Sequence, residues 1–497
     1  MRTVILHHLA FRRRPLKRTA LFFIFCGLTC SAIAQSKTLY EPSPEKYRQL
    51  ARDIFRQLIE TNTSHSVGSV TAACKKVQQR LLDAGFPASN LSLMGPSERK
   101  QNLVIRYRGS GQRKPILIIA HLDVVEAQRS DWTTDPFQFV EKDGYFYGRG
   151  TQDLKDNVAL LVATFIRLHE EGYRPDRDLI MALTADEENG PDDGVDWLVN
   201  NHRELFDVDF VLNPDDGGVE LEHGKPLVVG VEASEKLYAD YELTVTDRGG
   251  HSSLPHPGNP IFRLVDALGR LEQSPFPFEL NTVTRGYFSS LIPQVSAADA
   301  GAIGAILREP PDPAGFETLS HNTYYNALLR TTCVPTRLSA GHANNALPQT
   351  ATANVNCRIL PGHSPEEIRQ DLIRTFADPT ITVRYGNFAG QFFDTAPDRK
   401  SFPPPPPRPD VIGPIERIAA QMWPGVPVVS EMETGASDSV YTMAIGVPSY
   451  GVSGIALDND DIRAHGKDER LPVESFNRGL DFYYLYLKAL STMEAKR

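Results

Sequence analysis

The stretch Leu179-Ile-Met-Ala-Leu-Thr-Ala-Asp-Glu-Glu-Asn-Gly190 joins an apolar run to three consecutive carboxylates. A short apolar run bounded by polar residues is typical of a buried β-strand. In open α/β sheets, ligands bind beyond the carboxyl ends of the strands, and Asp186, Glu187 and Glu188 stand at such an end. There, one carboxylate can hold a metal ion while its neighbour handles the proton of a metal-bound water. Since an isolated Asp-Glu-Glu is more often a solvated acidic turn, the rest of the chain has to decide between the two interpretations.

Length and composition limit the classes of protein to which this chain can belong. The chain has 497 residues, of which 41% are hydrophobic and 23% charged, and this suits a globular protein of two or three domains. The net charge of −10, with few basic clusters beyond the N-terminus, argues against a nucleic-acid partner. After the N-terminal segment the chain keeps Cys74, Cys333 and Cys357. Three cysteines are not a disulfide framework, so we expect three buried free thiols and leave a Cys333–Cys357 bridge open.

The first 34 residues differ from the rest of the chain. Six basic residues precede the apolar stretch 19–30, and Ala32-Ile33-Ala34 supplies small residues at a cleavable spacing. A basic region, a short apolar region and such a site together predict a secretory signal peptide over residues 1–34. The apolar run is too short for a comfortable membrane span. We therefore expect a secreted or periplasmic protein without stable membrane insertion after cleavage, and an uncleaved anchor is the alternative.

The remaining sequence changes its periodicity twice. Apolar strands alternate with amphipathic helices over residues 41–235 and again over 400–497, which favours an α/β fold with a mostly parallel sheet and flanking helices. Residues 236–399 instead show half-exposed strands and helices, and this pattern predicts an inserted α+β domain. Within it, the Ala/Gly-rich residues 278–330 are expected to form a long excursion, and Pro403–Pro407 is the predicted linker back to the first domain.

Five groups of imidazole or carboxylate side chains follow predicted strands or lie in loops at the same edge of the expected sheet. Each has an ordinary explanation by itself, as a core histidine, a helix cap, a turn former or a surface residue. Their shared position favours a common role, and two histidines with three or four carboxylates suit Zn²⁺. The groups are His121 with Asp123, Asp153, Glu187 with Glu188, Asp215 with Asp216, and His465.

With these residues the sequence resembles the dizinc exopeptidases and amidohydrolases that include glutamate carboxypeptidase, aminoacylase, dipeptidases and succinyl-diaminopimelate desuccinylase. The resemblance runs from about residue 45 to 490, and its motifs are highly specific as an ordered set. It implies a zinc-exopeptidase-like catalytic domain in two segments, 41–235 and 400–497, and a lid and dimerisation domain over 236–399. The motifs are His121-Leu-Asp-Val-Val125, Gly148-Arg-Gly-Thr-Gln-Asp-Leu-Lys155, Ala185-Asp-Glu-Glu188, Gly249-Gly-His-Ser-Ser253, Asn345-Ala-Leu-Pro348 with Arg358, Gly435-Ala-Ser-Asp438, and His465-Gly466.

The resemblance also implies how the metal ligands are divided. One zinc ion would be bound by one histidine and one aspartate, the second by a glutamate and a histidine, and one aspartate would bridge both ions. The first ion would be bound by His121 and Asp215, the second by Glu188 and His465, and the bridging aspartate would be Asp153. Two Zn²⁺ ions per subunit are expected, and Co²⁺ or Mn²⁺ would fit similar ligands.

Further roles follow from the same resemblance. Glu187 would be the general base that takes the proton of the attacking water and delivers it to the leaving amine. Asp123 would orient the His121 ring through its far nitrogen. In the inserted domain His251 would stabilise the oxyanion, often in the neighbouring subunit's site. Asn345 would hold the substrate carbonyl side, and Arg358 would grip a substrate carboxylate.

The sequence departs from part of this family at the ligand position that Asp215 or Asp216 occupies. Many carboxypeptidase-like members carry glutamate at that position, whereas an aspartate there resembles the aminopeptidase and dipeptidase members. Counting from the strand entry at Asp209 favours Asp215 over Asp216, which stays the alternative. We expect a zinc-dependent, homodimeric metallo-exopeptidase that cleaves a terminal peptide bond of small peptides. The alternative is an aminoacylase-like N-acyl-amino-acid amidohydrolase with the same site. A non-catalytic binding protein would lack ligands or the base, and none of these residues is missing.

Overall fold

The computed structural model describes residues 40–188, 190, 192–387, 390–398, 402 and 404–492. The predicted signal peptide over residues 1–34 lies outside these residues, and so does Pro403 of the predicted linker. Within the described part of the chain, no helix combines the length and the apolarity needed to cross a membrane.

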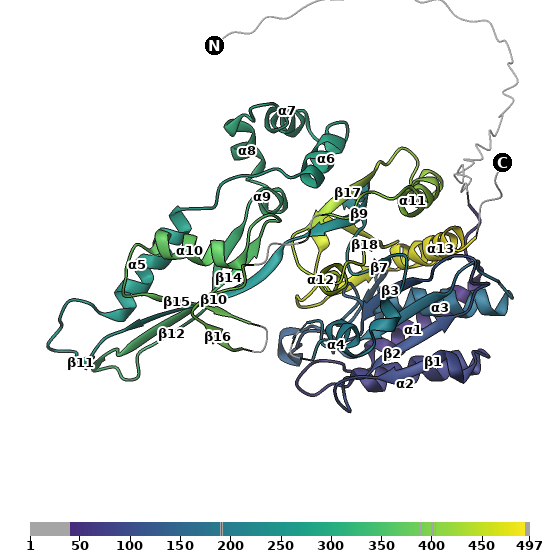
Figure 1. Cartoon of the computed structure of the whole chain (residues 1–497), viewed down its shortest axis with the longest axis horizontal. Helices are drawn as coiled ribbons and strands as arrows, with labels where there is room; N and C mark the ends of the chain where they lie inside the picture. Colours follow the sequence, from purple (N-terminus) through teal and green to yellow (C-terminus); the bar gives the residue numbers. More distant parts are fainter. Residues whose placement is uncertain are drawn as a thin grey trace, which may run out of the picture. The chain divides into compact units, whose positions relative to one another are not determined.

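The larger sheet contains ten strands (Figure 1). They are β1 (Leu91–Met94), β2 (Asn102–Tyr107), β3 (Ile116–His121), β6 (Leu179–Thr184), β7 (Val211–Asn213), β8 (Gly218–Glu222), β9 (Lys225–Glu235), β17 (Val428–Glu433), β18 (Ser449–Gly451) and β19 (Ala456–Asp458). Their order is β1-β2-β6-β3-β7-β18-β9-β8-β19, with β17 paired to β9. The central strands β6, β3, β7 and β18 are parallel, whereas β1, β2 and the β8–β9 pair add antiparallel partners. The predicted α/β class is confirmed, and the sheet is a mixed one with a parallel centre.

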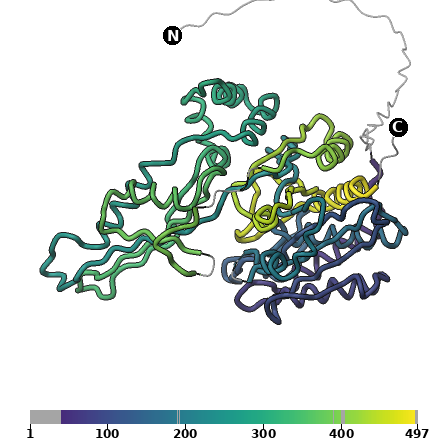
Figure 2. The backbone as a smooth tube through the Cα atoms, in the orientation of Figure 1, coloured from purple at the N-terminus to yellow at the C-terminus, as the bar shows by residue number. Residues whose placement is uncertain are grey.

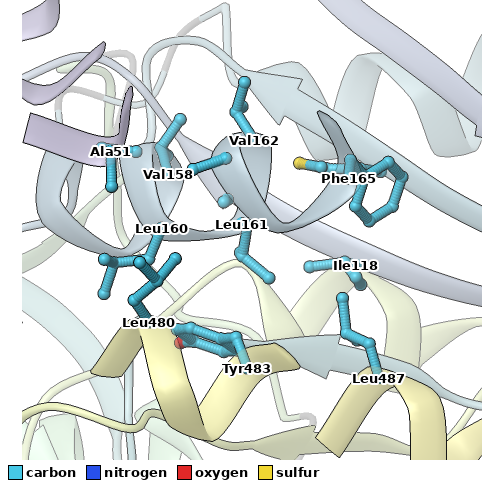
Figure 3. Packing of buried hydrophobic residues seen from close by; sticks show 14 of the residues in the cluster. Ala51, Ile118, Val158, Leu160, Leu161, Val162, Phe165, Leu480, Tyr483 and Leu487 are labelled. Atoms are coloured by element: carbon cyan, nitrogen blue, oxygen red, sulfur yellow. The ribbon is translucent and has the colours of Figure 1, made fainter. Parts of the chain in front are cut away.

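Helices cover the faces of this sheet, and the best buried of them is α3. All its residues from Lys155 to Leu168 are buried, as expected for a helix that is apolar on nearly every side. Figure 3 shows Leu161 of α3 pointing down from the helix toward the layer that holds Ile118 of β3 and Leu487 of α13, and all three belong to one core. Each such fully buried side chain stabilises the fold by about 1.5–3 kcal/mol relative to exposure. The helices beside this sheet are α1 (Glu45–Ile59), α2 (Val70–Asp83), α3 (Lys155–Glu170), α4 (Gly194–Asn201), α11 (Pro409–Met422), α12 (Ser439–Ala444) and α13 (Val473–Leu490).

A second sheet of five strands comes entirely from residues 237–393. Its strands are β10 (Leu237–Thr246), β12 (Thr332–Ala340), β14 (Thr350–Ile359), β15 (Thr382–Gly386) and β16 (Phe392–Phe393). The order is β12-β14-β10-β15-β16, and every pair is antiparallel. Residues of β10 and β14 alternate between buried and half-buried, because helices α5 (Pro260–Gln273) and α10 (Pro365–Phe376) pack on one face of the sheet (Figure 1). Figure 2 shows the chain entering this sheet directly from β9.

The predicted excursion at residues 278–330 is helical. It carries the short helices α6 (Thr282–Leu291), α7 (Ala297–Ile306), α8 (Pro313–Leu319) and α9 (Thr323–Leu329). Each begins at a residue whose side chain accepts a hydrogen bond from the helix backbone, and these caps are Asn281, Ser296, Asp312 and Asn322. The helices share a core with Val228 of β9 and with Val429 and Met432 of β17. The excursion therefore packs on the larger sheet.

The expectation of three free thiols is wrong. Cys333 and Cys357 form a disulfide between β12 and β14, where the two residues stand directly opposite each other with their Cα atoms 4.1 Å apart. Their pairing depends on the register of two strands, which the spacing of the cysteines in the sequence does not reveal. Cys74 is free, and burial raises the pKa of its thiol to about 12.

Candidate metal centre

The predicted ligands gather where parallel strands end. His121 is the last residue of β3, Glu188 follows β6, and Asp215 follows β7. Because β3 lies between β6 and β7, the carboxyl ends of three neighbouring strands bring these side chains together, as in other open α/β sheets.

Asp186, the first acid of the opening stretch, takes a structural position. Its backbone is left-handed, with φ of 64°. Its carboxylate pairs with the amino group of Lys100 at 2.7 Å and with the ring of His65 at 2.8 Å. These contacts fix the turn and leave the next two glutamates to face the site.

Two groups of three side chains each place one potential ligand atom within 4.8 Å of the others. The groups are His121, Glu187 and Asp215, and Asp153, Glu188 and His465. Asp153 links them, because its Oδ1 lies 3.0 Å from His121 Nε2 and its Oδ2 lies 2.8 Å from His465 Nε2. Asp215 Oδ1 lies 3.5 Å from His121 Nε2, and Glu188 Oε2 lies 3.0 Å from His465 Nε2.

The donor set fits divalent cations. His121 Nε2 and Asp153 Oδ1 are buried and lie 3.0 Å apart, but neither makes a hydrogen bond of good geometry, and buried polar atoms of this kind normally do. Imidazole nitrogens and carboxylate oxygens are the ligands that Zn²⁺ accepts, and two histidines with shared carboxylates suit two ions. The arrangement is therefore a candidate two-metal centre.

The electrostatics of the site favour positive charge. Burial raises the pKa of Glu187 well above its ordinary value, and Asp215 and Glu188 add to the rise. Burial also raises the pKa of Glu188 to about 7. Hydrogen bonds that the His465 ring donates to the carboxylates of Asp153 and Glu188 raise the pKa of His465 to about 10. Crowded carboxylates that hold protons in this way would be stabilised by bound cations instead.

Asp123 contacts the far nitrogen of the His121 ring, as expected, and does so through its main chain. The far nitrogen Nδ1 donates to the main-chain carbonyl of Asp123 at 3.1 Å, whereas the carboxylate is 3.7 Å away. This hydrogen bond leaves Nε2 free to act as a ligand atom. The Asp123 carboxylate instead accepts the backbone N–H groups of Glu187 at 3.2 Å and Glu188 at 3.1 Å, so it positions the acidic pair.

A buried ion pair that the sequence does not reveal connects two segments that carry proposed metal ligands. Arg149 Nη1 donates to Glu469 Oε2 at 2.7 Å, and both side chains are almost completely buried. Glu469 also accepts the backbone N–H groups of Gly150 and Gln152. Arg149 Nη2 donates to the carbonyl of His465 at 3.2 Å. The pair ties the loop before Asp153 to the segment that carries His465.

A cavity of about 650 Å³ opens beside the two groups. Glu187, Glu188 and Asp215 line it together with Arg358 from β14. The guanidinium of Arg358 lies over the ring of Tyr238, 4.8 Å from its centroid. The predicted carboxylate-binding arginine thus faces the space in which a substrate would lie.

His251 and Asn345 are not brought to this cavity. His251 lies in a separate two-stranded ribbon of β11 (Gly250–His251) and β13 (Ala346–Leu347), and Asn345 directly precedes β13. The Ser252 N–H donates to the Asn345 carbonyl at 3.0 Å. Both side chains are exposed, and neither lines the cavity in the described part of the chain. A role for either residue therefore requires a site other than the one formed by its own chain in this conformation.

Known proteins resemble this chain over most of its length. It is 28% identical over 401 residues to a probable carboxypeptidase S-like 2 of Dictyostelium discoideum, covering 78% of this chain and 74% of that protein. It is 29% identical over 384 residues to the N-fatty-acyl-amino acid synthase/hydrolase PM20D1 of Xenopus tropicalis, covering 74% and 71%. The solved M20 family metallo-carboxypeptidase Sso-CP2 of Sulfolobus solfataricus superimposes with a TM-score of 0.65 at 15% identity, covering 89% and 99%. Residues 117–489 match the peptidase family M20/M25/M40. The chain therefore belongs to the peptidase family M20/M25/M40, and it is a hydrolytic enzyme.

Proposed function

We propose that this enzyme is a two-zinc exopeptidase that cleaves a terminal peptide bond of small peptides. The observation that carries the proposal is the position of Asp153, whose two carboxylate oxygens each approach a different histidine. A carboxylate placed in this way suits two metal ions bridged by one side chain. The peptidase family match and the resemblance to a protein named carboxypeptidase S-like support the reaction type.

His121 and Asp215 would hold one ion, Glu188 and His465 the other, and Asp153 both. When bound, the two cations would polarise the scissile carbonyl and make a nearby water more acidic.

Glu187 is the group we assign to proton transfer. Its half-buried side chain lies beside the ligands, and the Asp123 carboxylate fixes its backbone. It would take a proton from the attacking water and deliver it to the leaving amine. Arg358 would bind a carboxylate of the substrate, for which its planar guanidinium provides two parallel donors.

An N-acyl amino acid is the second candidate substrate class. The observation that favours it is the 29% identity to a protein named N-fatty-acyl-amino acid synthase/hydrolase. Such a substrate also carries a carboxylate for Arg358 and an amide bond for the metal centre. The chemistry would be unchanged, and only the group on the acyl side would differ.

A screen of substrates separates these candidates. The metal-replete enzyme should be compared on free dipeptides, N-blocked dipeptides and N-acetyl amino acids, with a chelator control. Cleavage of free dipeptides alone would indicate a dipeptidase or aminopeptidase, and cleavage of N-blocked substrates a carboxypeptidase or acylase. Turnover that survives complete metal removal would refute the two-metal proposal. Reconstitution with Zn²⁺, Co²⁺ or Mn²⁺ would show which ion gives the highest activity.

We also propose that the enzyme is a homodimer through residues 236–399, acting as a lid and dimerisation domain. Leu254, Phe262 and Leu338 are large apolar side chains in this segment with exposed fractions of 74%, 70% and 61%. Exposed apolar surface of this kind often marks a protein interface. Mixing the His251→Ala and Glu187→Gln proteins tests both the dimer and the expected role of His251 in the neighbouring subunit's site. If His251 acts in the neighbouring site, mixed dimers regain one complete site, so activity should return. A monomer by light scattering, with full activity, would refute the dimer.

Residues 1–34 are proposed to be removed during export to the periplasm or the medium. The sequence pattern alone supports this proposal. N-terminal sequencing of the protein recovered from periplasmic and secreted fractions tests it, and a mature start near Gln35 is the expected result. An intact N-terminus in a membrane fraction would favour the anchor instead.

A further inference from the structure

One wall of the catalytic cavity is built from carboxylates that the proposed mechanism does not use. Glu220 on β8 and Glu431 and Glu433 on β17 all line the cavity. The two strands pair with opposite edges of β9, since Val219 and Val428 both stand beside the same residue of that strand. We refer to Glu220, Glu431 and Glu433 as the acidic wall.

Among the described residues, no basic side chain forms a salt bridge with the wall. Glu433 accepts the backbone N–H groups of Thr434 and Gly435, and the side chains of Glu220 and Glu431 share a hydrogen bond. Glu431 is 8% exposed, and its Oε2 is buried without a hydrogen-bond partner. Glu220 Oε1 is also buried without a partner, while its Oε2 accepts the hydroxyl of Tyr287 at 3.0 Å. Burial, followed by the neighbouring carboxylates Glu220 and Glu433, raises the pKa of Glu431 well above its ordinary value. Burying a carboxylate without a cation costs free energy. A positively charged partner would therefore stabilise the wall.

The surrounding fold makes room for these carboxylates. A Cβ atom added at Gly230 of β9 would overlap the carboxylate of Glu431, so only glycine allows this close approach. The helical excursion adds Tyr287 from α6 beside Glu220 and Tyr324 from α9 on the cavity surface. Aromatic faces beside carboxylates are well suited to an organic cation.

We propose that the acidic wall is a substrate subsite for an organic cation, an ammonium or guanidinium group. The inference rests on the proposed peptidase or amidohydrolase function and names the substrates that it prefers. Among the described residues, the only groups whose ligand atoms converge closely enough for a metal ion are the two at the catalytic centre. The three carboxylates of the wall do not form such a group, so a ligand with several N–H donors fits the wall better than a bare ion. Substrates would then carry a lysine-like or arginine-like side chain, or an amine, at this end of the cavity.

Near-isosteric substrate pairs test the proposal. Lysine and norleucine would be compared at each position of a dipeptide with alanine, and also as N-acetyl amino acids. We expect kcat/KM to favour lysine by at least about tenfold at one position, because the neutral side chain leaves buried carboxylates unpaired. Glu431→Gln and Glu220→Gln should abolish this preference mainly by weakening the lysine substrate. The control is Glu222→Gln on the same strand, since Glu222 is exposed and does not line the cavity.

A binding measurement keeps this inference separate from the proposed function. Calorimetry with n-butylammonium, and with 1-butanol as the neutral control, needs no turnover. We expect n-butylammonium to bind the wild type and the Glu222→Gln control alike, and Glu431→Gln at least about tenfold more weakly. If no substrate is hydrolysed but this pattern holds, the proposed function fails and the subsite stands. If peptides are cleaved without a preference for lysine, and the wild type does not bind the ammonium more tightly than the alcohol, the subsite is refuted.

Discussion

Replacing Glu469 by glutamine would show how strongly the buried ion pair holds the metal centre together. The change keeps the size of the side chain and removes its charge. Arg149 would then stay buried, with 4% of its side chain exposed, and would lose its carboxylate partner at 2.7 Å. Removing one member of a buried pair typically costs about 3–5 kcal/mol, since the other charge remains in the interior. We expect the free energy of unfolding of Glu469→Gln to fall by that amount.

The same substitution should also weaken metal binding and catalysis. Glu469 holds the backbone of Gly150 and Gln152, next to the bridging Asp153, and Arg149 holds the carbonyl of His465. Loss of supporting hydrogen bonds around a metal site commonly lowers metal affinity about 10- to 100-fold. A displacement of the ligands by about 1 Å can lower the rate by about 100-fold. Both metal affinity and kcat should therefore fall in Glu469→Gln.

The assay is urea unfolding followed by circular dichroism, in the presence of a chelator so that metal binding does not add to the measured stability. Glu474→Gln is the matched control, because the Glu474 side chain is 80% exposed and its loss should change stability by less than about 0.5 kcal/mol. A double-mutant cycle with Arg149→Met isolates the pair. The reasoning fails if Glu469→Gln costs less than about 1 kcal/mol, or if the two changes are additive.

Three further predictions concern other parts of the enzyme. Glu187→Gln should keep its metal content but lose hydrolysis by at least about 100-fold; full activity would remove its assigned role. Burial lowers the pKa of Lys155 from its ordinary value of 10.5 to about 7. Between pH 7 and 10.5 the Lys155 amine is therefore protonated in the unfolded chain and neutral in the folded protein. Raising the pH over this range should thus stabilise wild type by roughly 3–5 kcal/mol more than Lys155→Met in urea titrations. Replacing Cys333 and Cys357 by serine should cost about 3 kcal/mol, given their separation of 24 residues, whereas equal melting curves would contradict this.

The position of the candidate metal centre could be predicted because it depends on local sequence. Each ligand on the central strands directly follows an apolar run, and parallel strands end at one edge of a sheet. His121, Glu188 and Asp215 illustrate this relation, and the structure brings them together. The roles of these side chains in catalysis stay predictions, since geometry limits what a residue can do and activity measurements decide what it does.

Contacts that depend on pairing between distant segments could not be predicted in the same way. Glu469 and Arg149 are 320 residues apart, and nothing in the sequence around Glu469 distinguishes it from a surface acid. The Cys333–Cys357 bridge depends on the register of β12 and β14. The helices over residues 282–329 are short, and their cohesion comes from a core shared with β9 and β17 rather than from a marked apolar stripe of their own.

The acidic wall shows why such long-range contacts bear on specificity. Glu431 lies in Val428–Glu433, a strand whose sequence Val-Val-Ser-Glu-Met-Glu shows no regular alternation that would mark Glu431 as buried. It is buried because β17 pairs with β9 and because the helical excursion covers this end of the sheet. Three of the proposed metal ligands, His121, Glu188 and Asp215, come from the parallel centre of the sheet, whereas the wall comes from the added strands β8 and β17. Variation in those strands and in the helices over them could therefore change the preferred substrate while the metal centre stays the same.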